Sequence, residues 1–290
     1  MSQEFSQIPI TTQKVKPGIH ASTFWAMTRK ELTVMARYPV EFIASFGRVF
    51  LIVAIFVLGG KTFSQQQSPA SGMGSNTSGL VVYGFILFMF LGDTLWTVGY
   101  AIRHEQVQGT LEQLYLSPAS KFASLVSRVT NTLIWTGLLC VAGGALMALM
   151  IGRLPVQNPL LGLYVLALSL AGTFGIGFAF AALTLRIKEA AQTLANLLQF
   201  VFLILCANFF PFSALPPALY SLARLIPMAY SVDAFRSALM GFPPGFPELA
   251  PFPVEVAIIT AFGILMPFVG YALYRRAEIQ ARRRGSLSAY

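Results

Sequence analysis

Residues 160–185 read LLGLYVLALSLAGTFGIGFAFAALTL and contain no charged side chain. A helix needs about 20 apolar residues to cross roughly 30 Å of hydrocarbon, so this stretch is long enough to span a membrane. The whole chain agrees, because 56% of its 290 residues are hydrophobic, 11% are charged and its mean hydropathy is +0.67. Such values are typical of a polytopic membrane protein rather than of a soluble domain.

Six apolar stretches predict an all-α membrane protein with six transmembrane helices. The predicted spans are residues 42–60, 80–102, 122–151, 160–185, 195–210 and 254–274. Since no polar segment is long enough to build a separate core, we expect a single transmembrane domain over residues 1–290. It divides into a cytosolic N-terminus with an interfacial helix (1–38), a six-span permease core (42–274) and a cytosolic basic tail (275–290).

Two segments outside the spans carry patterns of their own. Residues 21–37 place Trp25 and other apolar side chains at helical spacing among basic residues, which predicts a helix lying in the membrane interface. Residues 210–217 read FPFSALPP, and proline interrupts a helix because it lacks an N–H donor. Residues 218–240 are too interrupted to span and too apolar for an ordinary loop, so we expect a re-entrant pair of short helices in the outer leaflet.

The distribution of basic residues predicts the orientation. With six spans, most of the 20 Lys and Arg side chains fall on one side, and cytosolic flanks hold the excess of positive charge. Both termini and the segment between the second and third spans are therefore predicted to be cytosolic. The formal charge of +9 then reflects topology and attraction to lipid headgroups, not nucleic-acid binding.

That cytosolic segment, residues 103–114, reads RHEQVQGTLEQL and is followed by Ser117-Pro118. A compact charged segment between two apolar helices indicates a contact with a partner protein. Leu111 and Leu114 offer apolar anchors for such a contact, and Glu105 and Glu112 offer negative charges. Gly109 allows close backbone approach to a neighbour. The alternative is an ordinary solvated loop helix.

These residues resemble a known family. Glu105, then Gly109-Thr110-Leu111-Glu112 and Ser117-Pro118, lying between the second and third spans, are similar to the cytosolic segment of permease subunits of ABC-2 type (type V) ABC transporters. The predicted architecture agrees along most of the chain. One departure is that the family often has a second acid just before the glycine, where this chain has Val107 and Gln108.

The resemblance implies a coupling helix that docks on a separate ATPase subunit and transmits its ATP-driven closure. The residues it assigns to that contact are Glu105, Gly109, Thr110, Leu111, Glu112 and Leu114. ATP and Mg²⁺ would bind two copies of that partner, and a second permease chain would complete a homodimer or a heterodimer. The nearest phosphate-loop match in this chain, Gly59-Gly60-Lys61-Thr62, has Ile55 where the first glycine belongs. We therefore expect neither catalysis nor a cofactor in this chain.

The resemblance also implies an exporter in the prokaryotic cytoplasmic (inner) membrane that moves an amphiphile, such as a lipid, glycolipid or drug, by alternating access. Pro227, Tyr230 and Arg236 resemble the family's Pro, Tyr and Arg in the segment before the last span. We assign Tyr230, Asp233 and Arg236, together with Asp93, to a translocation path or gate.

Asp93 lies within the second predicted span, where an unpaired carboxylate is costly. It either lines an aqueous path or is the buried partner of a Ser, Thr or Trp side chain such as Trp96. A proton-coupled secondary transporter that uses Asp93 is the alternative function. A membrane-embedded enzyme is a further one, but the two histidines form no catalytic motif, and the separated Cys140 and Cys206 predict no zinc site.

Overall fold

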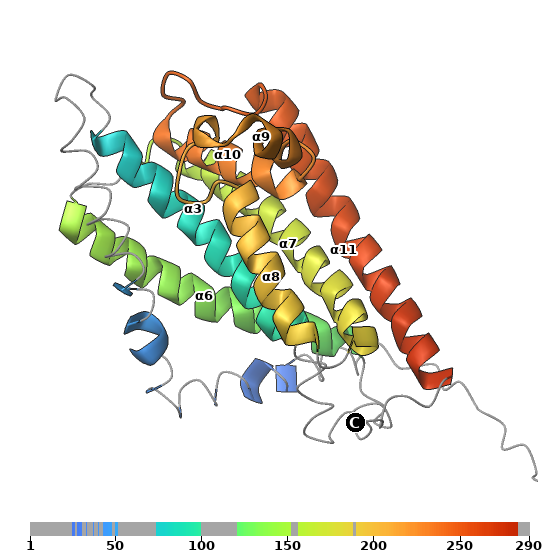
Figure 1. Ribbon diagram of the computed structural model, residues 1–290. Helices are drawn as coiled ribbons and strands as arrows, with labels where there is room; N and C mark the ends of the chain where they lie inside the picture. Colours follow the sequence, from blue (N-terminus) through green and yellow to red (C-terminus); the bar gives the residue numbers. More distant parts are fainter. Residues whose placement is uncertain are drawn as a thin grey trace, which may run out of the picture.

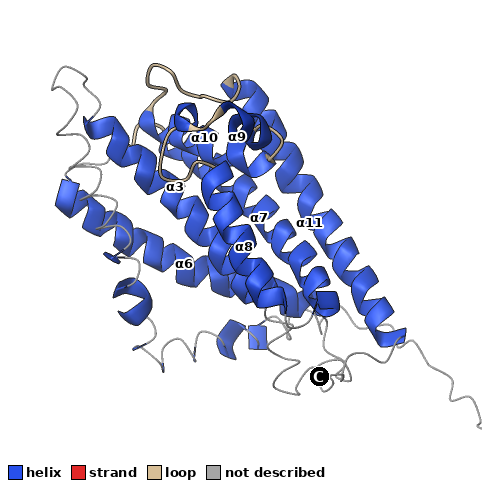
Figure 2. Ribbon diagram, in the orientation of Figure 1, coloured by secondary structure: helices blue, strands red, loops and turns tan. Residues whose placement is uncertain are grey.

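The structure is a computed structural model that describes residues 74–99, 121–151, 156–187 and 190–283, with scattered helical positions between 25 and 51. Within these residues every regular element is a helix and no strand occurs (Figure 2). The predicted all-α class is confirmed for this part of the chain. The interfacial helix and the first span lie largely outside it, so the count of six spans stays a prediction.

Four helices in the described part of the chain are long and apolar enough to cross a membrane. They are α3 (Gly74–Thr94), which continues into a π-helical segment η1 (Leu95–Gly99), then α6 (Lys121–Ile151), α7 (Pro159–Ile187) and α11 (Phe252–Arg283). They coincide with the second, third, fourth and sixth predicted spans. The chain is therefore an integral membrane protein. The last helix runs on to Arg283, so part of the predicted basic tail is helical.

The fifth predicted span has the expected length but begins and ends five residues earlier. Helix α8 runs over Ala190–Leu205, whereas hydropathy placed the span at 195–210. The backbone leaves the helix at Cys206, and Ala207 adopts a positive φ of 47°. The Asn208 side chain donates to the carbonyl of Phe202 at 3.0 Å and closes the last turn. The residues after the turn are still apolar, which is why hydropathy did not detect the helix end.

Helices α3, α7, α8 and α11 run side by side, and α6 is inclined away from them (Figure 1). Among the described helices, the most extensive contact is between α7 and α11. A side chain at Gly175 would meet the backbone of Met266 and Pro267, and one at Gly270 would meet the carbonyl of Gly175. These glycines let the two backbones touch, as small residues do in membrane helix pairs.

The small-residue stripe that α7 carries every four residues packs against other helices. Ser169, Thr173 and Ala181 are fully buried, and Gly177 faces Thr94 at the end of α3. The Thr173 hydroxyl lies 3.5 Å from the sulfur of Met228. The stripe therefore has a packing role.

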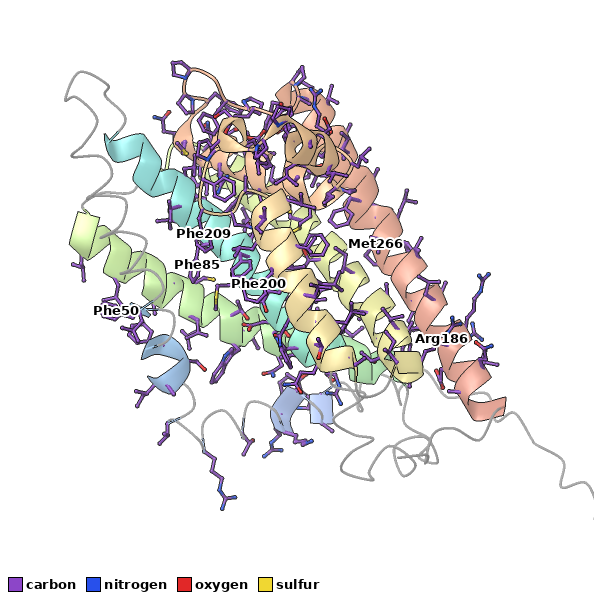
Figure 3. All side chains as sticks on the ribbon, viewed as in Figure 1. Phe50, Phe85, Arg186, Phe200, Phe209 and Met266 are labelled. Atoms are coloured by element: carbon purple, nitrogen blue, oxygen red, sulfur yellow. The ribbon has the colours of Figure 1, made fainter. Side chains whose placement is uncertain are left out.

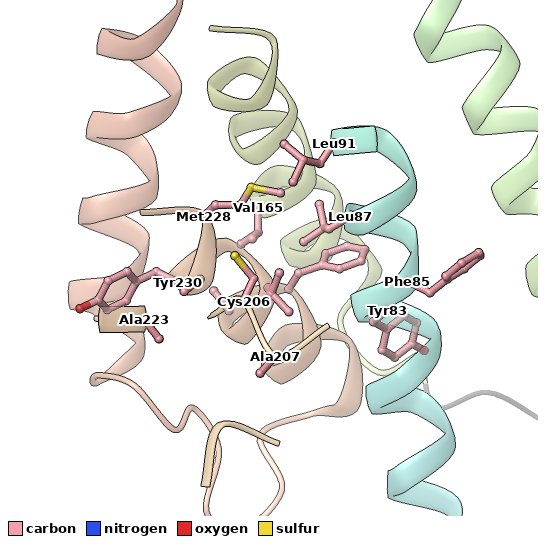
Figure 4. Close-up of a cluster of buried hydrophobic side chains, with 14 of the residues drawn as sticks. Tyr83, Phe85, Leu87, Leu91, Val165, Cys206, Ala207, Ala223, Met228 and Tyr230 are labelled. Atoms are coloured by element: carbon pink, nitrogen blue, oxygen red, sulfur yellow. The ribbon is translucent and has the colours of Figure 1, made fainter. Parts of the chain in front are cut away.

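Between α8 and α11 the chain forms η2 (Phe212–Ala214), α9 (Pro217–Ala223) and α10 (Pro227–Met240) at one end of the bundle (Figure 1). Two short helices are present where the sequence predicts a pair, with proline at the start of each. Their re-entrant position in the outer leaflet stays a prediction. Helix α10 ends at Met240 and is capped by Gly241, which has a φ of 76°. Every residue of α10 after Pro227 is buried. Figure 4 shows Met228 of α10 and Cys206 in the same buried cluster as Leu87 and Leu91 of α3.

Candidate functional site

Arg236 lies in the second half of the buried helix α10, with none of its surface exposed. Its Nε donates to the carbonyl of Leu80 at 2.9 Å, its Nη2 to that of Ala207 at 2.8 Å and its Nη1 to that of Phe210 at 3.4 Å. The guanidinium therefore joins α10 to the N-terminal part of α3 and to the turn after α8. Burial lowers the pKa of Arg236 to about 10, opposed by the charges of Asp233 and Glu248, so the group stays cationic at neutral pH.

Gly84 provides the room for this side chain. A Cβ at that position would collide with Nη2 of Arg236 and with the carbonyl of Asn208. Glycine at this point of α3 thus lets the guanidinium reach the backbone carbonyls. The sequence predicted a role for Arg236 but not for Gly84, because a glycine in an apolar helix gives no indication of which side chain lies against it.

Asp233 lies near Arg236 on the same helix and is also fully buried. Its Oδ2 accepts hydrogen bonds from the backbone amides of Glu248 and Leu249, both at 2.7 Å. Burial raises the pKa of Asp233, and the two amides together with a hydrogen bond from Glu255 oppose that rise. Asp233 therefore fixes the loop that leads from α10 into α11.

Glu255, in the first turn of α11, completes this arrangement. It is fully buried, and its Oε1 accepts a hydrogen bond from the amide of Ala250 at 3.3 Å. The prediction missed Glu255, although a carboxylate near the start of an apolar span was a signal of the same kind as Asp93. We call Tyr230, Asp233, Arg236, Glu248 and Glu255 the α10 cluster.

Tyr230 connects α10 to the end of α9. Its hydroxyl donates to the carbonyl of Arg224 at 2.8 Å, directly after α9. Tyr230, Asp233 and Arg236 are thus brought together on one short helix, as the sequence indicated. Each of them binds backbone of a neighbouring segment, which makes α10 a rigidly held element.

Asp93 forms a separate polar group between α3 and α6, which we call the Asp93 cluster: Asp93, Thr97, Thr132 and Thr136. The Thr136 hydroxyl donates to Oδ2 of Asp93. The Thr97 hydroxyl lies 2.6 Å from the Asp93 carbonyl and 2.5 Å from the hydroxyl of Thr132. One of the two interpretations of Asp93 was that it is the buried partner of a side chain such as threonine. Thr136 of α6 donates to its carboxylate, and Thr132 of the same helix is linked to it through Thr97.

The segment η1 connects the Asp93 cluster to the end of the bundle opposite α10. Gly99, its last residue, accepts a hydrogen bond from Thr184 of α7 at 3.3 Å, and a Cβ there would collide with the ring of Phe180. At this end the Arg186 guanidinium donates to the Gln280 side chain at 3.0 Å, which ties α7 to α11 (Figure 3).

The six predicted coupling residues, Glu105 to Leu114, lie outside the described residues. The elements on either side of them are described: η1 ends at Gly99 and α6 begins at Lys121. Both elements contribute threonines to the Asp93 cluster. Among the described residues, no group of three or more His, Cys, Asp or Glu side chains is placed to hold a metal ion.

Comparison with known proteins adds two findings. The sequence profile of a family described as "ABC-2 type transporter" matches residues 22–240. Nodulation protein J of Neorhizobium galegae is 29% identical over 110 residues, which cover 36% of this chain and 40% of that protein. The chain therefore spans about two fifths of the length of this relative.

Proposed function

We propose that this chain, which belongs to the ABC-2 type transporter family, is the membrane-spanning permease subunit of an ATP-driven exporter. Membership of that family makes it a transport subunit. The finer assignment concerns its partner, its substrate and the direction of transport. The expected cargo is an amphiphile, such as a lipid, glycolipid or drug, that moves by alternating access.

The proposed coupling to ATP rests on the position of the Asp93 cluster. Thr97 of η1 is bonded to Thr132 of α6, and these two elements flank the predicted coupling segment on either side. A partner that pushes on residues 103–114 would displace η1 and α6 together. The hydrogen bond from Thr136 to Asp93 would transmit that displacement to the middle of the bundle.

We place ATP and Mg²⁺ on a separate ATPase subunit, present in two copies, and we expect a second permease chain, identical or different. In this scheme both termini and residues 103–114 face the cytosol of a prokaryotic cell. The α10 cluster then lies at the outer end of the bundle. There it holds the outer side closed, because Arg236 ties α10 to α3 and to the turn after α8.

The assignment is tested by reversing one charge in the coupling segment. Glu112→Arg is compared with Glu189→Arg, which makes the same change in the predicted cytosolic connection between α7 and α8. Each purified variant is reconstituted with the ATPase in proteoliposomes. We expect Glu112→Arg to insert normally but to lose ATPase association and ATP-dependent transport, while Glu189→Arg keeps both.

Equal association and transport in both variants would overturn the coupling assignment. Transport that needs no ATP and stops when the proton gradient is dissipated would instead establish the secondary transporter that uses Asp93. The same proteoliposomes distinguish these outcomes, because nucleotide and proton gradient are varied independently.

A further inference from the structure

The carboxyl groups of Asp233 and Glu255 meet in a fully buried position between α10 and α11. Both residues have no exposed surface. One oxygen of each carboxyl binds backbone: Oδ2 of Asp233 accepts from Glu248 and Leu249, and Oε1 of Glu255 accepts from Ala250. Three successive amides of the connecting loop are therefore held by two carboxyl groups.

The second oxygens of the two carboxyl groups have no donor. Oδ1 of Asp233 and Oε2 of Glu255 are buried, and no N–H or O–H group in the described part of the chain donates to either. Yet the two side chains are within hydrogen-bond reach of one another. Two carboxylates cannot hydrogen-bond without a proton, and two negative charges in contact repel strongly at low dielectric.

We propose that Asp233 and Glu255 form one proton-binding site, in which a shared proton ties α10 to the start of α11. A single proton supplies the missing donor for both orphaned oxygens and removes one of the two charges. The carboxylic acid then donates to the carboxylate, as in other paired carboxyl groups. The inference rests on contacts within this chain and is independent of the proposed function.

In the described part of the chain, no neighbouring group donates to these two oxygens in place of the proton. The charged or titratable groups on the elements around the pair include Arg236 and Tyr230 of α10, Glu248 of the loop, Tyr220 and Arg224 at α9, Cys206 after α8 and Tyr83 of α3. Arg236 gives its hydrogen bonds to three backbone carbonyls, and Arg224 gives one to the carbonyl of Leu249 at 3.1 Å. Glu248 adds a further negative charge beside Asp233.

The direction of the pH effect follows from burial. Because burial raises the pKa of Asp233, the folded pair keeps its proton above the pH at which an unfolded carboxyl loses it. The proton's contribution to stability is present at low pH and is lost as the pH rises through the titration of the folded pair. At high pH the second charge loosens the hold on residues 248–250 and separates α10 from α11.

The test uses the full chain in lipid nanodiscs. Thermal unfolding is followed from acid to alkaline pH for the wild type, for Glu255→Gln and for Glu248→Gln. The side-chain amide introduced by Glu255→Gln would donate an N–H to Asp233 at every pH and so imitate the protonated pair. Glu248→Gln is the matched control, because its carboxylate binds the amides of Phe212 and Ser213 instead of another carboxyl.

We expect the melting temperature of the wild type and of Glu248→Gln to fall as the pH rises, and that fall to be lost in Glu255→Gln. An infrared pH titration should also show the carbonyl band of a protonated carboxyl that is absent in Glu255→Gln. If Glu255→Gln does not fold, Asp233→Asn replaces it, because its amide can donate to Glu255. An unchanged pH dependence together with an unchanged infrared band would overturn the proposal.

Discussion

Arg236 of α10 donates from Nε to the carbonyl of Leu80 in α3 at 2.9 Å, across 156 positions of sequence. A guanidinium provides several donors in a fixed plane, and this one meets carbonyls of α3 and of the turn after α8 at once. One side chain therefore assembles three segments at the α10 end of the bundle.

Replacing Arg236 with Lys should destabilise the protein without removing the charge. An ammonium cannot match the planar guanidinium, so at least one of the three carbonyls loses its donor, at a cost of about 2–3 kcal/mol. Unfolding of the purified chain in mixed micelles measures the change. Arg224→Lys is the control, since Arg224 is exposed and gives one hydrogen bond, to Leu249. Equal losses in the two variants would show that the planar geometry at 236 is unimportant.

A methyl group added between α7 and α11 should be costly. In Gly175→Ala the new Cβ meets the backbone of Met266 and Pro267, which cannot move aside as a flexible side chain would. Overpacking of this kind costs about 1–3 kcal/mol. In Gly137→Ala, on α6, nothing lies within 4 Å of the added Cβ, so helix propensity should stabilise that variant by up to about 1 kcal/mol. Similar unfolding energies for the two variants would contradict the close packing of α7 on α11.

The sequence was sufficient for the long helices but not for the contacts of α10. Hydropathy locates α7 because lipid selects a long uncharged run, and proline marks the starts of α9 and α10. It did not locate the end of α8, because the residues after its last turn remain apolar. The partners of Arg236 are backbone carbonyls, which every residue has, so no pattern of side chains could identify them.

Asp93→Asn distinguishes a functional carboxylate from a structural one. The amide preserves the size of the side chain and still accepts the hydrogen bond from Thr136, so the protein should fold. If Asp93 lines the path or gate, transport in proteoliposomes should fall about tenfold or change its pH dependence, because an amide does not ionise. Thr136→Val serves as the control that removes the partner but keeps the acid. Normal transport by Asp93→Asn across the pH range would make Asp93 a packing residue.

The bond between Thr97 and Thr132 should couple η1 to α6 energetically. The two hydroxyls are 2.5 Å apart, and Thr132 and Thr136 are buried on the same face of α6. A double-mutant cycle of Thr97→Val and Thr132→Val should give an interaction energy of about 0.6 kcal/mol, with an upper limit near 1.7 kcal/mol, as for other hydrogen bonds between membrane helices.

The same four proteins can be compared in their rates of ATP-dependent transport. If η1 and α6 carry motion from the coupling segment, each valine should lower ATP-dependent transport, and the second should add little to the first because the bond is already broken. Thr130→Val is the control, since its hydroxyl bonds to the Val126 carbonyl within α6. Additive losses in the double variant, or an equal loss in Thr130→Val, would mean that this pair packs the helices without transmitting movement between them.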